Sequence, residues 1–248
     1  PLPHEIFLDR VNSKGLDIDH YKNLEDLQND IQKFLDKSWN ARSLLGTNLK
    51  SKETLFEITS PADRNKKIGT KQNSPVEHVD KAIDIALNSF YSWSKTPTKK
   101  RAKYLIDLGN IIEQNSSELI ALLMLEGGKI LSNAIGEIRE AVDFCRYYAK
   151  EAEEKLSSPI LLKSPTGEEN WLSHEGKGIM VCISPWNFPA AIFIGQITAA
   201  LVTGNTVIAK PATQTTLIAH RLVEMCHEVG IPRGALQLML GGGSSIGS

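Results

Sequence analysis

The sequence has few cysteines, and no pattern joins them into a structural site. The three of them, Cys145, Cys182 and Cys226, are widely spaced, which supports neither a disulfide framework nor a zinc-binding spacing. The six histidines include no His-x-x-x-His pair, and no carboxylates cluster at the spacing of metal ligands. These absences indicate a reducing compartment and predict that the protein has no metal site.

Neither charge nor hydrophobicity is concentrated in one part of the chain. Lys and Arg number 28 against 29 Asp and Glu, and no basic stripe with interleaved aromatics argues for nucleic acid as a partner. The longest apolar run, at 190–202, is interrupted by Gly195, Gln196 and Thr198 and is too short to span a bilayer. The chain begins Pro-Leu-Pro-His-Glu without an initiator Met or a signal segment, and we expect it to have been cut from a longer protein.

Hydrophobic periodicity divides the chain into four segments. A polar arm with one helix comes first and a helical stretch follows. Two short extended runs then flank a glycine-containing turn, and strands alternate with helices at the end. We predict an N-terminal arm and helix at 1–73, long helices at 74–156, a β-hairpin at 157–177 and the first part of a parallel sheet at 178–248.

Apolar residues at helical spacing predict where the helices lie. In the arm we expect a helix over 23–36, then a strand candidate at 54–61 and turn-rich polar chain up to residue 75. Three long helices should follow: one that starts near Ser74-Pro75, one over 98–126 that ends at Gly127-Gly128, and one over 132–154.

The last segment has the form strand–helix–strand–helix–strand with short connections. This pattern is typical of a right-handed parallel sheet in an α/β fold. The strands are predicted at 178–183, 205–210 and 234–240, and the helices at 191–201 and 215–229. Ligands of such sheets lie beyond the carboxyl ends of the strands. The fold would bring three such ends to one edge: 184–189, 210–215 and 241–247.

The residues at these strand ends have structural as well as chemical explanations. Asn187 is a residue type that turns favour, and Lys210 could be a solvated loop lysine. The run GGGSSIG fits G-x-G-x-x-x-G, not the tighter dinucleotide fingerprint, and could also be a linker. Cys182 lies inside a strand without a basic neighbour, so we interpret it as a core residue and not a nucleophile. Cys145 and Cys226 lie in helical patterns and are interpreted in the same way.

Taken together, the motifs ISPWNFP, TGNTVIAKPA and GGGSSIG resemble those of the aldehyde dehydrogenase superfamily, in order and spacing. The flanks PLPHEIF…NSKGLDI and EGGKILSNAIGEIREAVDFCRYYAKEAE resemble the proline utilization A enzymes of bacteria. In those bifunctional enzymes a proline dehydrogenase half precedes an L-glutamate γ-semialdehyde (1-pyrroline-5-carboxylate) dehydrogenase half. The resemblance implies an incomplete Rossmann-like sheet preceded by the helical part of the cofactor domain, with 157–177 as an oligomerisation flap.

The resemblance also implies roles for single residues. Asn187 would donate its amide to the oxyanion that forms when a cysteine thiolate attacks the aldehyde. The other matched positions divide into cofactor and substrate residues. Lys210 would bind the adenosine ribose, Gly243 and Gly247 would lie beside the pyrophosphate, Ser184, Pro185 and Trp186 would line the nicotinamide side, and Phe188 and Glu140 would lie near the substrate.

Two departures from the family pattern qualify these roles. Members that prefer NAD usually carry Glu where this chain has Thr213, which leaves NADP as an alternative to NAD. A threonine there could also simply cap the following helix. The family's nucleophilic cysteine and general-base glutamate would lie beyond Ser248, so we expect residues 1–248 alone to be inactive.

The resemblance therefore predicts part of an NAD-dependent oxidoreductase that converts L-glutamate γ-semialdehyde to glutamate through a cysteine thiohemiacetal. FAD would belong only to the proline dehydrogenase half. We expect a cytoplasmic homo-oligomer that uses the 157–177 flap, and peripheral contact of the parent protein with the inner membrane is kept open. An aldehyde dehydrogenase for another substrate class and a non-catalytic scaffold are the alternatives.

Overall fold

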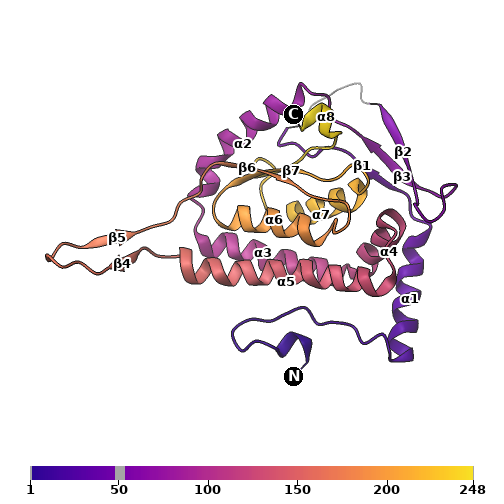
Figure 1. The fold of residues 1–248 in the computed structure, drawn as a ribbon, viewed down its shortest axis with the longest axis horizontal. Helices are drawn as coiled ribbons and strands as arrows, with labels where there is room; N and C mark the ends of the chain where they lie inside the picture. Colours follow the sequence, from indigo (N-terminus) through magenta and orange to yellow (C-terminus); the bar gives the residue numbers. More distant parts are fainter. Residues whose placement is uncertain (1, 48–53, 248) are drawn as a thin grey trace.

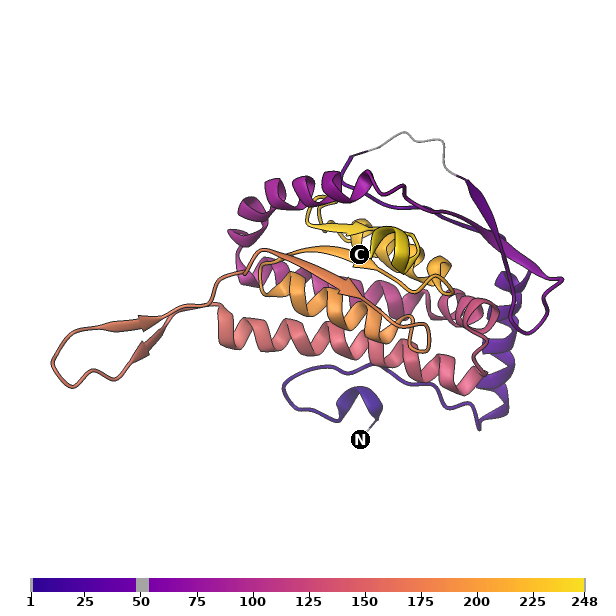
Figure 2. The same cartoon turned by 45° about the horizontal axis from the view of Figure 1, so that its top comes forward.

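A computed structural model describes residues 2–47 and 54–247. A parallel sheet lies between helix α2 (His78–Ser94) on one face and helices α6 (Ala191–Val202) and α7 (Thr216–Glu228) on the other (Figure 1). Helices α3 (Thr98–Gln114) and α5 (Leu131–Leu156) form a further layer beneath α6 and α7 (Figure 2). The α/β layering predicted from the sequence is therefore confirmed.

The parallel sheet consists of β6 (Ile179–Ile183), β7 (Thr206–Lys210) and β8 (Leu236–Leu238), in the order β6-β7-β8. In its register Cys182 pairs with Ala209, and Ala209 pairs with Leu238. The predicted strand–helix–strand–helix–strand order is confirmed, although β8 is shorter than expected. Every residue of β7 is buried, as expected of a central strand with helices on both faces.

A second, mixed sheet has the order β1-β3-β2, with β1 at Trp39–Ala41, β2 at Leu55–Thr59 and β3 at Lys67–Gln72. Only β2 was expected, and the turn-rich interpretation of 62–75 was wrong over β3. The sequence KIGTKQ is polar, but its residues Ile68, Gly69 and Thr70 are buried. Gly69 lies so close to β1 that an added Cβ would collide with the Trp39 carbonyl oxygen, and glycine permits this approach.

The helix predicted over 98–126 is in fact two helices, α3 and α4 (Ser116–Gly127), which meet at Asn115. The Asn115 side chain donates a hydrogen bond to the Ile111 carbonyl at 2.7 Å, and such side-chain bonds compete with helix continuation. Gly128, with φ of 65°, ends α4 as predicted. The expected helix over 23–36 corresponds to α1 (Tyr21–Leu35), and the one over 132–154 to α5.

Residues 157–177 form the predicted hairpin, with β4 (Ile160–Leu162) antiparallel to β5 (Asn170–Leu172). Figures 1 and 2 show that it projects away from the helices. Every residue in its two strands is exposed, including Leu161 and Trp171. An isolated two-stranded hairpin is marginally stable in water, so this segment gains little from its own contacts.

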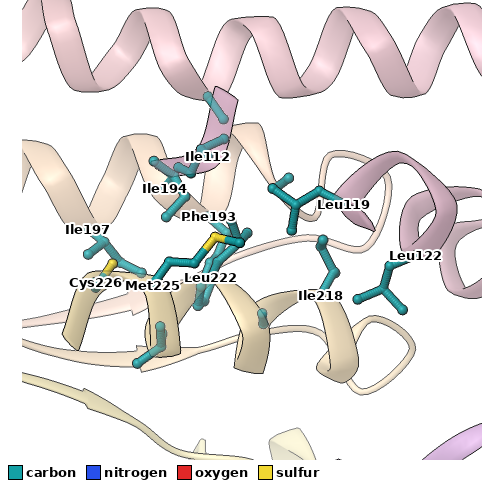
Figure 3. Packing of buried hydrophobic residues seen from close by; sticks show 14 of the residues in the cluster. Ile112, Leu119, Leu122, Phe193, Ile194, Ile197, Ile218, Leu222, Met225 and Cys226 are labelled. Carbon is teal, nitrogen blue, oxygen red and sulfur yellow. The ribbon is translucent and has the colours of Figure 1, made fainter. Parts of the chain in front are cut away.

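The main hydrophobic core lies between α6 and α7 and the helices beneath them. Figure 3 shows side chains of α6 and α7 that point toward one another and toward residues of α3 and α4. Phe193, Ile194 and Ile197 contribute from α6, and Leu222 contributes from α7, all fully buried. Burying each such side chain contributes roughly 1.5–3 kcal/mol. No residue of α6 is exposed.

The N-terminal arm, which begins with a short 3₁₀ helix at Pro3–Glu5, is held to α3 and α5 by polar contacts. The Ser13 amide donates to Asp143 at 2.6 Å, and Arg146 donates to the Asn12 carbonyl at 2.8 Å. Within residues 2–47 and 54–247, no helix is both long and apolar enough to cross a bilayer. The same residues hold no group of three or more potential metal ligands.

Candidate functional site at the carboxyl edge of the sheet

The candidate site is the carboxyl edge of the parallel sheet, defined here as residues 184–190, 210–215 and 239–247. These residues lie at or follow the ends of β6, β7 and β8. The Ser184 amide donates to the Lys210 carbonyl at 3.2 Å, and the Met239 amide donates to the Ala209 carbonyl at 2.9 Å. The structure thus joins the three strand ends that the sequence predicted to meet.

The turn after β6 presents Asn187 to solvent between two exposed aromatic side chains, Trp186 and Phe188. Asparagine is common in turns because its side chain bonds to nearby backbone. Among the described residues, the Asn187 side chain makes no such bond. Its amide is therefore free to donate to a ligand, although its predicted role with an oxyanion stays a prediction.

A buried carboxylate fixes the start of the helix that follows this turn. Glu137 of α5 is 1 % exposed, and its Oε1 accepts from the amides of Ala190 at 2.6 Å and Ala191 at 3.2 Å. Its Oε2 lies 2.6 Å from the ammonium of Lys129, which stands 4.4 Å from the centre of the Phe188 ring. Helix N-termini favour negative charge, so Glu137 positions both α6 and the turn.

The loop after β7 begins with Lys210, which is 9 % exposed and forms no ion pair with another described residue. Thr213 follows, and its carbonyl accepts a hydrogen bond from the Lys71 ammonium at 2.6 Å. Helix α7 begins only at Thr216, with Thr215 as its N-cap. The alternative in which Thr213 caps this helix is therefore wrong.

A second buried carboxylate, Glu126 at the end of α4, fixes the start of α7. It is 5 % exposed, and it accepts from the Leu217 amide at 2.8 Å and the Ile218 amide at 2.9 Å. Burial raises the pKa of Glu126 from its usual 4.5 to about 7, although the backbone amides of α7 and the charge of Lys71 act to lower it. Desolvation of the charged form outweighs these favourable contacts.

The glycine run after β8 leads into a short helix, α8 (Gly243–Ile246). Gly243 is its first residue and Gly247 its C-cap, and the Gly247 amide donates to the Gly243 carbonyl at 3.0 Å. A Cβ added at Gly243 would meet no atom within 4 Å. The backbone at Gly243 therefore faces open space, as close approach of a ligand would require.

The remaining predicted substrate residue, Glu140, is exposed on α5, one turn beyond Glu137. It forms no ion pair or hydrogen bond with another described residue, and nothing ties it to the turn at Asn187. Pro185 is also exposed, next to the buried Ser184. The roles assigned to Glu140 and Pro185 stay predictions.

The three cysteines pack as structural residues, as expected. Cys182 is 7 % exposed, and burial raises its pKa to about 11. Burial also raises the pKa of Cys145 to about 12 and that of Cys226 well above its usual value. A nucleophilic cysteine needs a lowered pKa, so none of the three has the environment of a catalytic thiolate.

Sequence reasoning missed the charged residues that hold the edge in place, namely Glu126, Glu137, Lys129 and Lys71. One signal was available for Glu126, because it ends the apolar run LIALLMLEGG and must be buried with that run. A charge in a buried stretch requires a partner. No comparable pattern marks Lys71, whose partner is a backbone carbonyl distant in sequence.

Several proteins resemble this chain along nearly its whole length. The bifunctional protein PutA of Salmonella typhimurium is 36 % identical over 249 aligned residues, which cover 100 % of this chain and 18 % of that protein. The chain thus spans about a fifth of the length of that curated relative. A crystal structure of proline utilization A from Bdellovibrio bacteriovorus, inactivated by N-propargylglycine, matches with a TM-score of 0.89 and 31 % identity, covering 100 % of this chain and 25 % of that one.

A structure of 1-pyrroline-5-carboxylate dehydrogenase from Thermus with bound NAD matches with a TM-score of 0.88 and 26 % identity. That match covers 98 % of this chain and 47 % of the other. The sequence profile of the aldehyde dehydrogenase family matches residues 48–248. These matches agree with the motifs at the carboxyl edge and with the observed parallel sheet. The chain belongs to the aldehyde dehydrogenase family.

Proposed function

We propose that this chain is the dinucleotide-binding part of an NAD-dependent dehydrogenase for L-glutamate γ-semialdehyde in proline catabolism. The names of the similar proteins, PutA and 1-pyrroline-5-carboxylate dehydrogenase, support this substrate. In the proposal the nucleophilic cysteine and the general base lie outside residues 1–248, since the three cysteines present are buried with raised pKa values. Residues 74–156 and 178–248 form the cofactor domain, 1–73 the arm and 157–177 the flap.

The observation that carries the proposal is a buried hydroxyl without a partner next to a lysine without an ion pair, at adjacent strand ends. The hydroxyl of Ser184 has no hydrogen-bond partner among the described residues, and the Lys210 ammonium has no ion pair there. Buried polar groups are normally satisfied. A ligand with hydroxyl and phosphate groups would satisfy both, and the open backbone at Gly243 leaves room beside it. These residues therefore fit a dinucleotide.

In this arrangement each group has one task. Lys210 binds the adenosine ribose, Gly243 and Gly247 lie beside the pyrophosphate, and Ser184 and Trp186 line the nicotinamide side. When bound, NAD would supply the acceptor for the hydride that leaves the substrate carbon. The residue at 213 is neutral, so it does not repel a 2′-phosphate, and NADP remains a second cofactor within the proposal.

The turn after β6 would handle the substrate. Asn187 donates its amide to the oxygen that gains negative charge, which typically contributes a few kcal/mol to lowering the barrier. Phe188 contacts the aliphatic part of the substrate, and Glu140 approaches it from α5. Glu137 binds the Ala190 amide and Lys129 contacts the Phe188 ring, and these contacts fix the turn. The amide of Asn187 is therefore positioned before the substrate binds.

The proposal also includes assembly. The strands of the hairpin expose Ile160, Leu161 and Trp171, and a second copy of the chain that covered them would stabilise the hairpin. We place the protein in the cytoplasm, because its three cysteines are free and buried. Contact with the inner membrane would be a property of a longer protein with a proline dehydrogenase half.

The proposal is tested by titrating NAD into the full chain in a calorimeter. We expect saturable binding that Lys210→Gln weakens roughly 10-fold, because a charge-assisted hydrogen bond is lost. The chain should show no semialdehyde oxidation, and Cys182→Ser should change nothing. Absence of NAD and NADP binding would favour the scaffold alternative. Turnover that Cys182→Ser abolishes would instead overturn the placement of the nucleophile outside the chain.

A further inference from the structure

Two charged groups, the half-buried Lys71 and the buried Glu126, hold the loop 211–215 and the start of the helix that follows it. Lys71 of β3 donates to the Thr213 carbonyl at 2.6 Å, in the middle of the loop. Glu126 of α4 accepts from the Leu217 and Ile218 amides at 2.8 and 2.9 Å, just after the loop ends. Neither residue belongs to the carboxyl edge itself, and each reaches the loop from a different element.

We propose that Glu126 and Lys71 form a coupled pair of positioning residues that fixes the loop 211–215 in the conformation that binds the dinucleotide. This inference rests on the proposed function, because the loop is assigned to the adenosine ribose there. Glu126 fixes where α7 starts, and Lys71 fixes the direction of the Thr213 carbonyl. Loss of either contact frees one side of the loop and weakens cofactor binding.

The charges of the two residues depend on each other. The positive charge of Lys71 lowers the pKa of Glu126, and the negative charge of Glu126 raises the pKa of Lys71 against the larger effect of burial. Glu126 is buried and Lys71 is half-buried, and charges interact more strongly where water is partly excluded. The ionised carboxylate therefore helps to keep the ammonium of Lys71 beside the loop.

Among the described residues, the other titratable groups near α7 form no hydrogen bond with the loop 211–215. His220, one turn into the helix, has its pKa lowered to about 4 by burial and by Arg42 and Arg221, so it is neutral near pH 7. Glu118, at the opposite end of α4, forms ion pairs with Lys37 and Arg221. Lys71 is therefore the charge on a neighbouring element that acts on Glu126, together with the amides of α7.

Protonation of Glu126 would weaken the contacts that hold the loop 211–215. A carboxylate accepts from both amides, whereas in a carboxylic acid one of the two oxygens becomes a hydroxyl, which is a weaker acceptor and must itself donate a proton. The acid also loses its attraction for Lys71. Because burial raises the pKa of Glu126 to about 7, the loop should tighten as pH rises through neutrality, and dinucleotide affinity should rise with it.

The first test measures the Kd of the full chain for NAD between pH 6 and 8 by calorimetry. For the wild type we expect binding about 5-fold tighter at pH 8 than at pH 6, which corresponds to about 1 kcal/mol. Glu126→Gln, which mimics the protonated acid, should bind NAD with the weaker affinity at both pH values. Lys71→Gln should weaken binding and move the midpoint of the pH profile upward, because it removes the charge that favours ionised Glu126.

Glu118→Gln is the matched control, since Glu118 is equally buried on the same helix but holds no part of the loop. It should lower thermal stability without changing the pH profile of the Kd. A Glu126→Gln variant that keeps the wild-type pH profile would overturn the proposal. A Lys71→Gln profile with an unmoved midpoint, or a Glu118→Gln variant that flattens the profile, would do the same.

A second readout needs no cofactor and separates this inference from the proposed function. Amide hydrogen exchange in the ligand-free chain should show that protection at Leu217 and Ile218 falls between pH 8 and pH 6 in the wild type and not in Glu126→Gln. If NAD does not bind at any pH but protection changes as described, the proposed function fails and the coupled pair stands. Protection that is independent of pH in the wild type would refute the coupled pair itself.

Discussion

The ion pair beneath the turn at Asn187 allows a quantitative prediction. The side chain of Glu137 is 0 % exposed and that of Lys129 is 13 % exposed, and their charged atoms are 2.6 Å apart. Removing one partner of a buried pair leaves an uncompensated charge, at a cost of about 3–5 kcal/mol. Glu137→Gln keeps one oxygen for the Ala190 amide, so we expect the lower end, about 3 kcal/mol. For a chain of this size, 3–5 kcal/mol corresponds to a fall in Tm of roughly 6–20 °C.

A double-mutant cycle separates the ion pair from the cap. Lys129→Met removes the ammonium but leaves the carboxylate its two amide donors, so it should cost less than Glu137→Gln. The double variant has no unpaired charge and should be about 2 kcal/mol more stable than the sum of the single changes predicts. Urea denaturation of all four proteins supplies the free energies of unfolding. Additive costs would show that the two charges do not stabilise each other and would refute the reasoning.

Three further predictions follow from the site. In an active protein that includes the nucleophilic cysteine, Asn187→Ala should lower kcat by roughly 10²-fold with little change in cofactor affinity, and a fall in Tm alone would favour the turn interpretation. Thr213→Glu should raise the NAD/NADP ratio of kcat/KM about 10-fold, whereas an unchanged ratio would place residue 213 away from the ribose. Burial, with Arg42 and Arg221, lowers the pKa of His220 to about 4. Between pH 6.5 and 4 the unfolded chain therefore binds a proton that the folded chain excludes, and stability falls by up to about 3 kcal/mol on acidification. His220→Gln should remove this loss in urea denaturation, and a variant with the wild-type slope would refute it.

Sequence patterns predicted the parts of the fold in which one period dominates. The parallel strands and their crossover helices were found because short apolar strand patterns alternate with longer helical segments in 178–240. The strand β3 was missed because its sequence, KIGTKQ, is mostly polar and its buried positions include a glycine and a threonine. The break at Asn115 was missed as well, since apolar residues continue at helical spacing across it and only the side-chain bond to Ile111 interrupts the helix.

The sequence predicted which strand ends form the candidate site, but not the residues that hold this edge in place. Parallel strand ends must share an edge, so the meeting of Ser184 and Lys210 followed from topology. The residues that hold this edge come from helices and strands far away in sequence. Glu137 reaches α6 across 53 positions, and Lys71 reaches Thr213 across 142. No local pattern records such pairings, because they depend on how the layers stack.

The position of α6 between two layers has a consequence for synthesis of the protein. No residue of α6 is exposed in the fold, yet on the ribosome it emerges before β7 and β8, which belong to the sheet above it. At typical elongation rates the chain from the end of α6 to the end of β8 takes about 2 to 7 s to appear. During that interval a helix apolar on every side has only part of its final cover. This segment is therefore where we expect chaperones to bind the nascent chain.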